Sequence, residues 1–91
     1  MALFESSGTE DQGRQTHVAF LLTEVNAGLM FVARARAASD PVLRARSRIY
    51  AERAHDSVVR SMSLLTLTAS ERAALLDGLR RLHVAIAGLE I

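Results

Sequence analysis

Apolar residues recur every three or four positions between residues 16 and 38, which is the period of an α-helix. They form two stripes on nearly opposite sides of the expected helix, and a helix that is apolar on two sides must bury both. The sequence therefore predicts that this helix is either the centre of its own bundle or part of an interface with another chain. One stripe comprises Val18, Leu21, Leu22, Val25, Leu29 and Val32, and the other comprises Phe20, Ala27, Met30 and Phe31.

A second helix is expected from Pro41 to about Leu64. Asp40 suits the N-cap position, and Pro41 suits the first helical position, where its missing N–H costs nothing. The inward arc of this helix is predicted to include Leu43, Tyr50, Ala51, Ala54, Val58, Met62 and Leu65.

A third helix is expected from Thr68 to the end of the sequence. Thr68 and Glu71 match the capping box, in which each side chain accepts a hydrogen bond from the other residue's backbone N–H. Leucines at helical spacing form its apolar side. Its other side carries more small and apolar residues than a fully solvated helix face needs. Ala74, Gly78 and Ala85 on that side are a second candidate interface.

The fold class predicted from these patterns is all-α, a three-helix antiparallel bundle. No segment shows the alternation typical of a strand, and the short connections favour antiparallel neighbours. Residues 16–91 are expected to form the single helical-bundle domain. Residues 1–15 are rich in Ser, Gly and acidic residues and are expected to be a flexible acidic tail, in which only Leu3 and Phe4 could dock on an apolar surface.

The composition bears on size, compartment and membrane association. A chain of 91 residues buries only about 60% of its unfolded surface, and oligomerisation commonly compensates for so thin a core. The sequence contains no cysteine, which fits a reducing cytoplasm. The longest apolar run, from Val18 to Ala33, is interrupted by Thr23, Glu24 and Asn26. It is therefore expected to be too short and too polar to span a bilayer.

No residue pattern indicates catalysis, a metal or a cofactor. The three histidines, His17, His55 and His83, lack the spacing of a zinc site. Glu52 and Asp56 share a helix face, but neighbouring arginines explain them as an ion-pair network. We therefore expect that the protein is not an enzyme.

Arginine is unevenly distributed, although the net charge is only +1. Residues 34–60 hold seven of the eleven arginines and three acidic residues, which gives this segment a local charge of +4. Nucleic-acid binding is therefore the alternative function, although Glu52 and Asp56 neutralise part of the segment and no recognition motif accompanies it. The residues concerned are Arg34, Arg36, Arg44, Arg46, Arg48, Arg53 and Arg60.

Taken together, these observations predict a non-catalytic interaction or assembly module in the cytoplasm. The partner expected first is a second copy, forming a homodimer through Phe20, Ala27, Met30 and Phe31. A role as a small regulatory subunit of a larger complex would use the same surface on a different protein, and the sequence leaves this alternative open.

Overall fold

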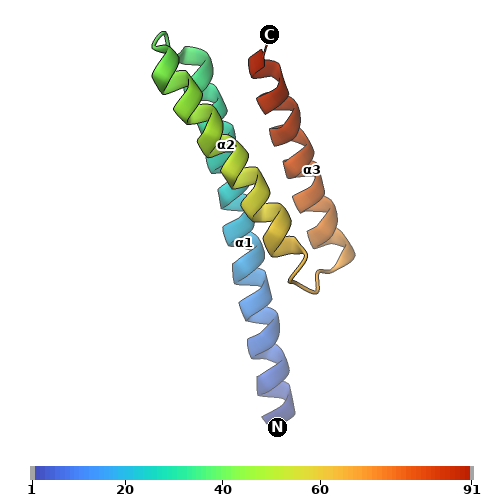
Figure 1. Cartoon of the computed structure of the whole chain (residues 1–91). Helices are drawn as coiled ribbons and strands as arrows, with labels where there is room; N and C mark the ends of the chain where they lie inside the picture. Colours follow the sequence, from blue (N-terminus) through green and yellow to red (C-terminus); the bar gives the residue numbers. More distant parts are fainter. Residues whose placement is uncertain (1, 91) are drawn as a thin grey trace.

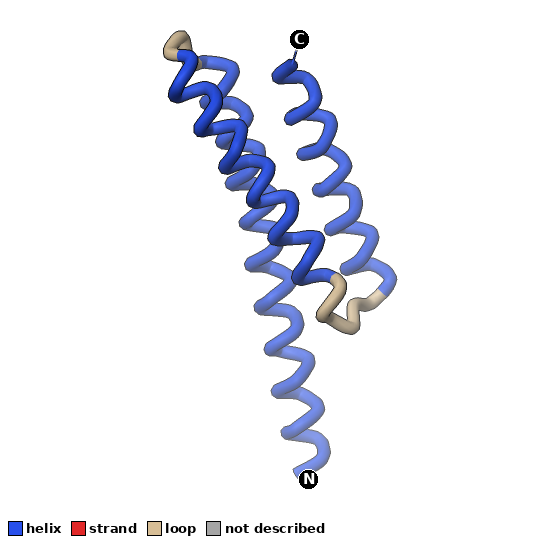
Figure 2. Tube along the Cα trace, viewed as in Figure 1, coloured by secondary structure: helices blue, strands red, loops and turns tan. Residues whose placement is uncertain are grey.

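The computed structural model describes the backbone of residues 2–90 and the side chains of residues 12–89. The described chain is helical and contains no strand, which confirms the all-α prediction (Figure 2). Its elements are α1 (Ala2–Ala37), α2 (Pro41–Met62), α3 (Ala69–Ala87) and the short 3-10 helix η1 (Gly88–Glu90).

The first helix is much longer than the other two. Figure 1 shows α2 lying beside the C-terminal half of α1, with α3 completing the bundle and the N-terminal turns of α1 extending beyond the α2–α3 connection. The molecule is consequently a rod of 59 × 19 × 17 Å rather than a sphere.

Both predicted helix starts are confirmed by their caps. The Asp40 carboxylate accepts a hydrogen bond from the backbone N–H of Val42 at 2.9 Å, and Pro41 follows at the first position of α2. At the start of α3, the Glu71 N–H donates to the Thr68 hydroxyl at 3.1 Å, and the Thr68 N–H donates to the Glu71 carboxylate at 2.9 Å. Each cap satisfies backbone groups that the helix itself leaves unpaired, a contribution of about 1 kcal/mol.

The core consists of two clusters along the rod. The larger cluster joins all three helices, and the smaller one lies nearer the α1–α2 connection. The larger cluster contains Val18, Leu21, Val25, Val58, Met62, Leu75 and Leu79. The smaller cluster contains Val32, Ala51 and Leu82.

Two glycines allow α3 to approach α1 closely. A Cβ atom on Gly28 would lie 2.8 Å from a methyl carbon of Leu82, and one on Gly78 would lie 3.2 Å from a methyl carbon of Val25. Such distances are shorter than ordinary carbon–carbon contacts. The missing side chains therefore create the room into which Leu82 and Val25 pack.

The start of α1 differs from the sequence prediction. The helix begins at Ala2 instead of near Thr16, so the backbone of residues 2–15 is helical. No proline interrupts this segment, and acidic residues are favourable towards the N-terminal end of a helix because of its dipole. The side chains before Gln12 lie outside the described residues, and the flexibility of residues 1–15 stays a prediction.

The length of α1 also differs from the expectation based on its apolar run. Among the described residues, the stretch from Gln12 to Ala37 is long and apolar enough to cross a membrane by length and composition. One helix of this kind is weak evidence for a membrane, because the core helix of a water-soluble bundle has the same properties.

Candidate protein interface

One side of α1 faces away from α2 and α3 and carries large apolar side chains. Phe20 is 60% exposed and Met30 is 59% exposed. These residues belong to a row in which positions alternate four and three residues apart, the spacing of a coiled-coil seam. We call this row the outer stripe, and it comprises Thr16, Phe20, Thr23, Ala27, Met30, Arg34 and Ala37.

The side chains in the middle of the outer stripe are small, and the hydroxyl group among them already has a hydrogen-bond partner. The Thr23 hydroxyl donates to the backbone carbonyl of Ala19 at 3.0 Å, so it does not depend on water for a partner. Ala27 is half-buried and presents only a methyl group. A second helix could therefore approach closely here, between the larger side chains of Phe20 and Met30.

Phe31 does not lie with the other three residues of the predicted interface. Its ring packs against Tyr50 of α2, with the ring centroids 5.2 Å apart, and it also contacts the smaller core cluster. The guanidinium of Arg34 lies 5.7 Å from the centroid of the Phe31 ring. The structure thus brings together Phe20, Ala27 and Met30, whereas Phe31 fills the contact between α1 and α2.

The residues of the second predicted interface, on α3, likewise do not share one exposed surface. Gly78 is buried against Val25 of α1, Ala85 is half-buried beside the smaller core cluster, and only Ala74 is exposed. The small residues of α3 therefore serve mainly the packing of α3 against α1.

A groove between α1 and α3 lies near the C-terminal ends of both helices. Two adjoining hollows of about 450 and 460 Å³ share Arg36 and Ala85. Arg80 and Arg81 stand at its rim, where both contact the carboxylate of Asp77, at 2.9 and 3.3 Å. We call this the arginine groove; it is lined by Leu29, Val32, Ala33, Arg36, Ala37, Arg80, Arg81, Val84 and Ala85.

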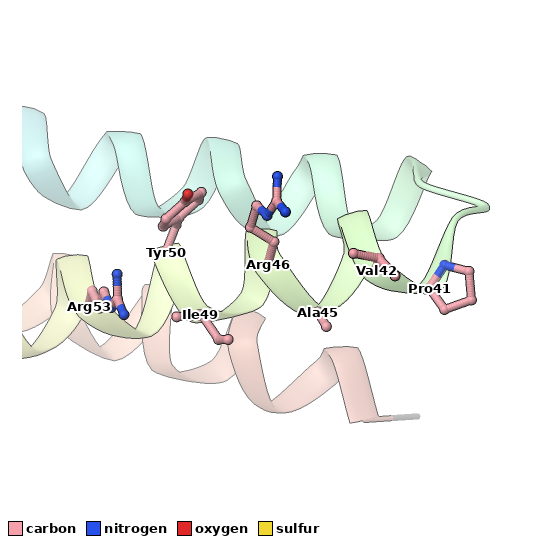
Figure 3. A pocket seen from close by; sticks show the side chains of 7 residues that line it. All are labelled: Pro41, Val42, Ala45, Arg46, Ile49, Tyr50 and Arg53. Atoms are coloured by element: carbon pink, nitrogen blue, oxygen red, sulfur yellow. The ribbon is translucent and has the colours of Figure 1, made fainter.

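A second, shallower hollow of about 500 Å³ follows the outer face of α2 (Figure 3). Leu43 and Tyr50 were predicted to point inward, but they are 48% and 41% exposed. The inward position at this level is taken by Ser47 and Ala51, which are small enough for α2 to lie close to α1. The hollow is lined by Pro41, Val42, Ala45, Arg46, Ile49, Tyr50 and Arg53.

The arginines of the nucleic-acid alternative are distributed over several surfaces. Arg44 donates to the backbone carbonyl of Ala38 at 2.8 Å, and Arg48 pairs with Glu52 at 3.0 Å. Arg34 belongs to the outer stripe and contacts Phe31. Of the rest, Arg36 lines the arginine groove, Arg46 and Arg53 line the α2 hollow, and Arg60 is exposed in the last turn of α2.

Two contacts between distant residues could not be predicted from spacing. The rings of His55 in α2 and His83 in α3 lie 6.1 Å apart, and the His55 ring also contacts Asp56. Within the described part of the chain, no three His, Cys, Asp or Glu side chains come together as a possible metal site.

The second contact joins α1 to the start of α3. Arg14 donates to the Glu71 carboxylate at 3.0 Å, while the backbone N–H of Thr68 donates to the same carboxylate. The Thr68 backbone hydrogen bond, assisted by Arg14 and opposed by partial burial, holds the pKa of Glu71 below its usual value. One carboxylate thus serves both as a helix cap and as the attachment point for α1.

No protein-family model matches this chain, and comparison with curated proteins and with solved structures also gives no match. Any assignment of function therefore rests on the described residues themselves.

Proposed function

We propose that the protein is a non-catalytic assembly module that pairs with a second copy through the outer stripe of α1. The observation that carries the proposal is the exposure of Phe20 and Met30, each with more than half of its surface in water. Burying apolar surface contributes about 25 cal/mol per Å², so these side chains favour association.

A second copy fits this surface better than an unrelated partner does. Phe20, Ala27 and Met30 are apolar residues at the spacing of a helix that packs against another helix, and the same row on two copies is self-complementary around a twofold axis. A 91-residue chain with two small core clusters also gains stability from additional buried surface. In this proposal the unit that assembles is an antiparallel three-helix bundle.

Light scattering coupled to size exclusion over a wide range of protein concentrations tests the proposal. We expect twice the chain mass for the wild type and a monomer for Phe20→Glu, because a charge would be buried in the interface. Leu64→Glu is the matched control, since Leu64 is 82% exposed but lies in the α2–α3 connection.

Two results would contradict the proposal. One is a monomeric wild-type chain at high concentration. The other is a Phe20→Glu variant that remains dimeric and unfolds at a lower temperature, which would identify Phe20 as a residue that stabilises its own chain. Circular dichroism on the same samples distinguishes loss of pairing from loss of helix.

A further inference from the structure

We infer that the arginine groove is a binding site for an amphiphilic anion, a small molecule that joins a carboxylate or phosphate group to an apolar chain. The inference goes beyond the proposed pairing of two copies and does not depend on it. It adds a ligand to a protein whose outer stripe is proposed to bind a partner.

The groove consists of two adjoining hollows whose walls differ in chemistry. One hollow, of about 450 Å³, is lined by three arginines, Arg36, Arg80 and Arg81, together with Val84 and Ala85. The other, of about 460 Å³, shares only Arg36 and Ala85 with the first. A ligand that occupies both hollows therefore needs an anionic group at one end and an apolar group at the other. The rest of the second hollow is entirely apolar and comprises Leu29, Val32, Ala33 and Ala37.

The positive charge of the first hollow is only partly neutralised by the described residues. Arg80 and Arg81 both pair with the single carboxylate of Asp77, at 2.9 and 3.3 Å. Arg36 makes no ion pair with any described residue. Its side chain reaches from α1 to the end of α3, where a Cβ atom on Gly88 would lie 3.2 Å from the Arg36 Nη2 atom. Guanidinium groups form paired hydrogen bonds with carboxylate and phosphate oxygens, so this hollow selects an anion.

The apolar part of the groove adjoins the core of the bundle. Val32 belongs to the smaller core cluster, and Leu29 packs against that cluster. Val84, by contrast, is 63% exposed although its side chain is wholly apolar. A bound alkyl chain would remove apolar surface from water on the ligand and on both helices, which favours binding.

The dimensions of the groove favour a small molecule over a protein segment. On α1 the lining runs from Leu29 to Ala37, which is about 12 Å of helix. Each hollow lies within the range of roughly 300–1,000 Å³ that is usual for small-ligand sites. A stable contact with another protein would normally bury roughly 1,000 Å² or more, which two turns of helix do not provide.

The hollow on the outer face of α2 offers a comparison within the same molecule. It also combines two arginines, Arg46 and Arg53, with apolar side chains such as Val42 and Ile49. All of its lining residues belong to α2, however, so no second helix forms an opposing wall (Figure 3). The arginine groove has walls from both α1 and α3 and can contact a ligand on two sides. The α2 hollow is therefore the matched control.

Isothermal titration calorimetry with decanoate, kept below the concentration at which it forms micelles, tests the inference. We expect saturable binding of one decanoate per chain. Decyltrimethylammonium has the same tail and a positive head, and it should bind at least about tenfold more weakly. Acetate lacks the tail and should give no measurable binding. Changes in backbone amide chemical shifts on adding decanoate should be largest at Ala33, Ala37, Val84 and Ala85.

Substitutions test the two ends of the ligand separately. Arg36→Gln with Arg81→Gln should weaken decanoate binding about tenfold, because two charged hydrogen-bond donors are lost. Ala33→Trp should weaken it at least as much by filling the apolar hollow, and it should not disturb the core because Ala33 is exposed. Arg46→Gln with Arg53→Gln removes the same charge from the α2 hollow and should leave the affinity unchanged. Circular dichroism confirms that each variant is folded.

Three results would overturn the inference. They are equal binding of decanoate and decyltrimethylammonium, equal loss of affinity in the two double arginine variants, and cosedimentation with phosphatidylglycerol vesicles without binding of free decanoate. The last result would identify the groove as a contact with an anionic membrane surface. None of them changes the mass measured by light scattering, so the proposed pairing is tested separately.

Discussion

Both sides of α1 carry large apolar side chains, but those side chains lie in opposite environments. On the inner side, Leu21 is 1% exposed and Val25 is 2% exposed, because α2 and α3 cover them. On the outer side, Phe20 and Met30 keep more than half of their surface in water. The identities of Phe20 and Met30 do not distinguish them from core residues, since phenylalanine and methionine are buried about as often as leucine is.

The difference between the two sides follows from the number of helices. Two neighbours can cover only part of the circumference of a central helix, and here both lie on the side of Leu21. Gly28 and Gly78 allow α3 to pack closely against α1 on that side. The second apolar stripe of this helix is therefore left uncovered by the chain's own helices.

The largest expected effect on the free energy of unfolding comes from comparing substitutions of two adjacent residues on the two sides of α1. Leu21→Ala should lower the free energy of unfolding by about 3 kcal/mol, because it leaves a cavity in the larger core cluster. Phe20→Ala should change it by less than about 1 kcal/mol when the chain is monomeric. Urea unfolding at low protein concentration measures both values, and equal losses would show that Phe20 belongs to the core.

A smaller effect on stability is expected from substituting two glycines of α1 that differ in their surroundings. Gly28→Ala should destabilise the fold by about 1–2 kcal/mol, because its methyl group would meet Leu82. Gly13→Ala, with nothing within 4 Å, should stabilise it by up to about 1 kcal/mol through helix propensity. Thermal melts measure whether each substitution raises or lowers the melting temperature. A higher melting temperature for Gly28→Ala would mean that α3 packs against α1 less closely than described.

The smallest effect concerns the attachment of α1 to α3. Because the pKa of Glu71 is lowered in the folded protein, its stabilising contribution is present above the unfolded value of 4.5 and is lost as pH falls through the lowered pKa. Glu71→Gln should therefore melt below the wild type at pH 7, and the gap should narrow towards pH 3. A gap that stays constant over this range would mean that the charge of Glu71 is unimportant. Glu52→Gln, which loses an exposed contact with Arg48, is the control and should shift the melting temperature less at pH 7.

Local signals in the sequence predicted local features well. The starts of α2 and α3 follow from Asp40, Pro41 and Thr68, because a cap depends only on residues within one turn. The burial of Val18, Leu21, Val25 and Val32 follows from helical periodicity.

The features that the sequence did not predict depend on packing between helices. The position of Phe31 is determined by Tyr50, and the burial of Gly78 is determined by Val25, and neither relation can be read from spacing within one helix. The early start of α1 has a different cause. Residues 2–15 lack apolar periodicity, and the Arg14–Glu71 contact that attaches the end of this segment joins positions far apart in the sequence.

The rod shape produced by the long first helix also has a hydrodynamic consequence. The radius of gyration is 16.1 Å, whereas a compact chain of this length would have about 12 Å. A single copy therefore experiences more friction than a sphere of equal mass, and it elutes early from a sizing column and sediments slowly. Elution volume would therefore overstate the mass of one copy, so the stoichiometry of this protein has to be taken from mass rather than from size.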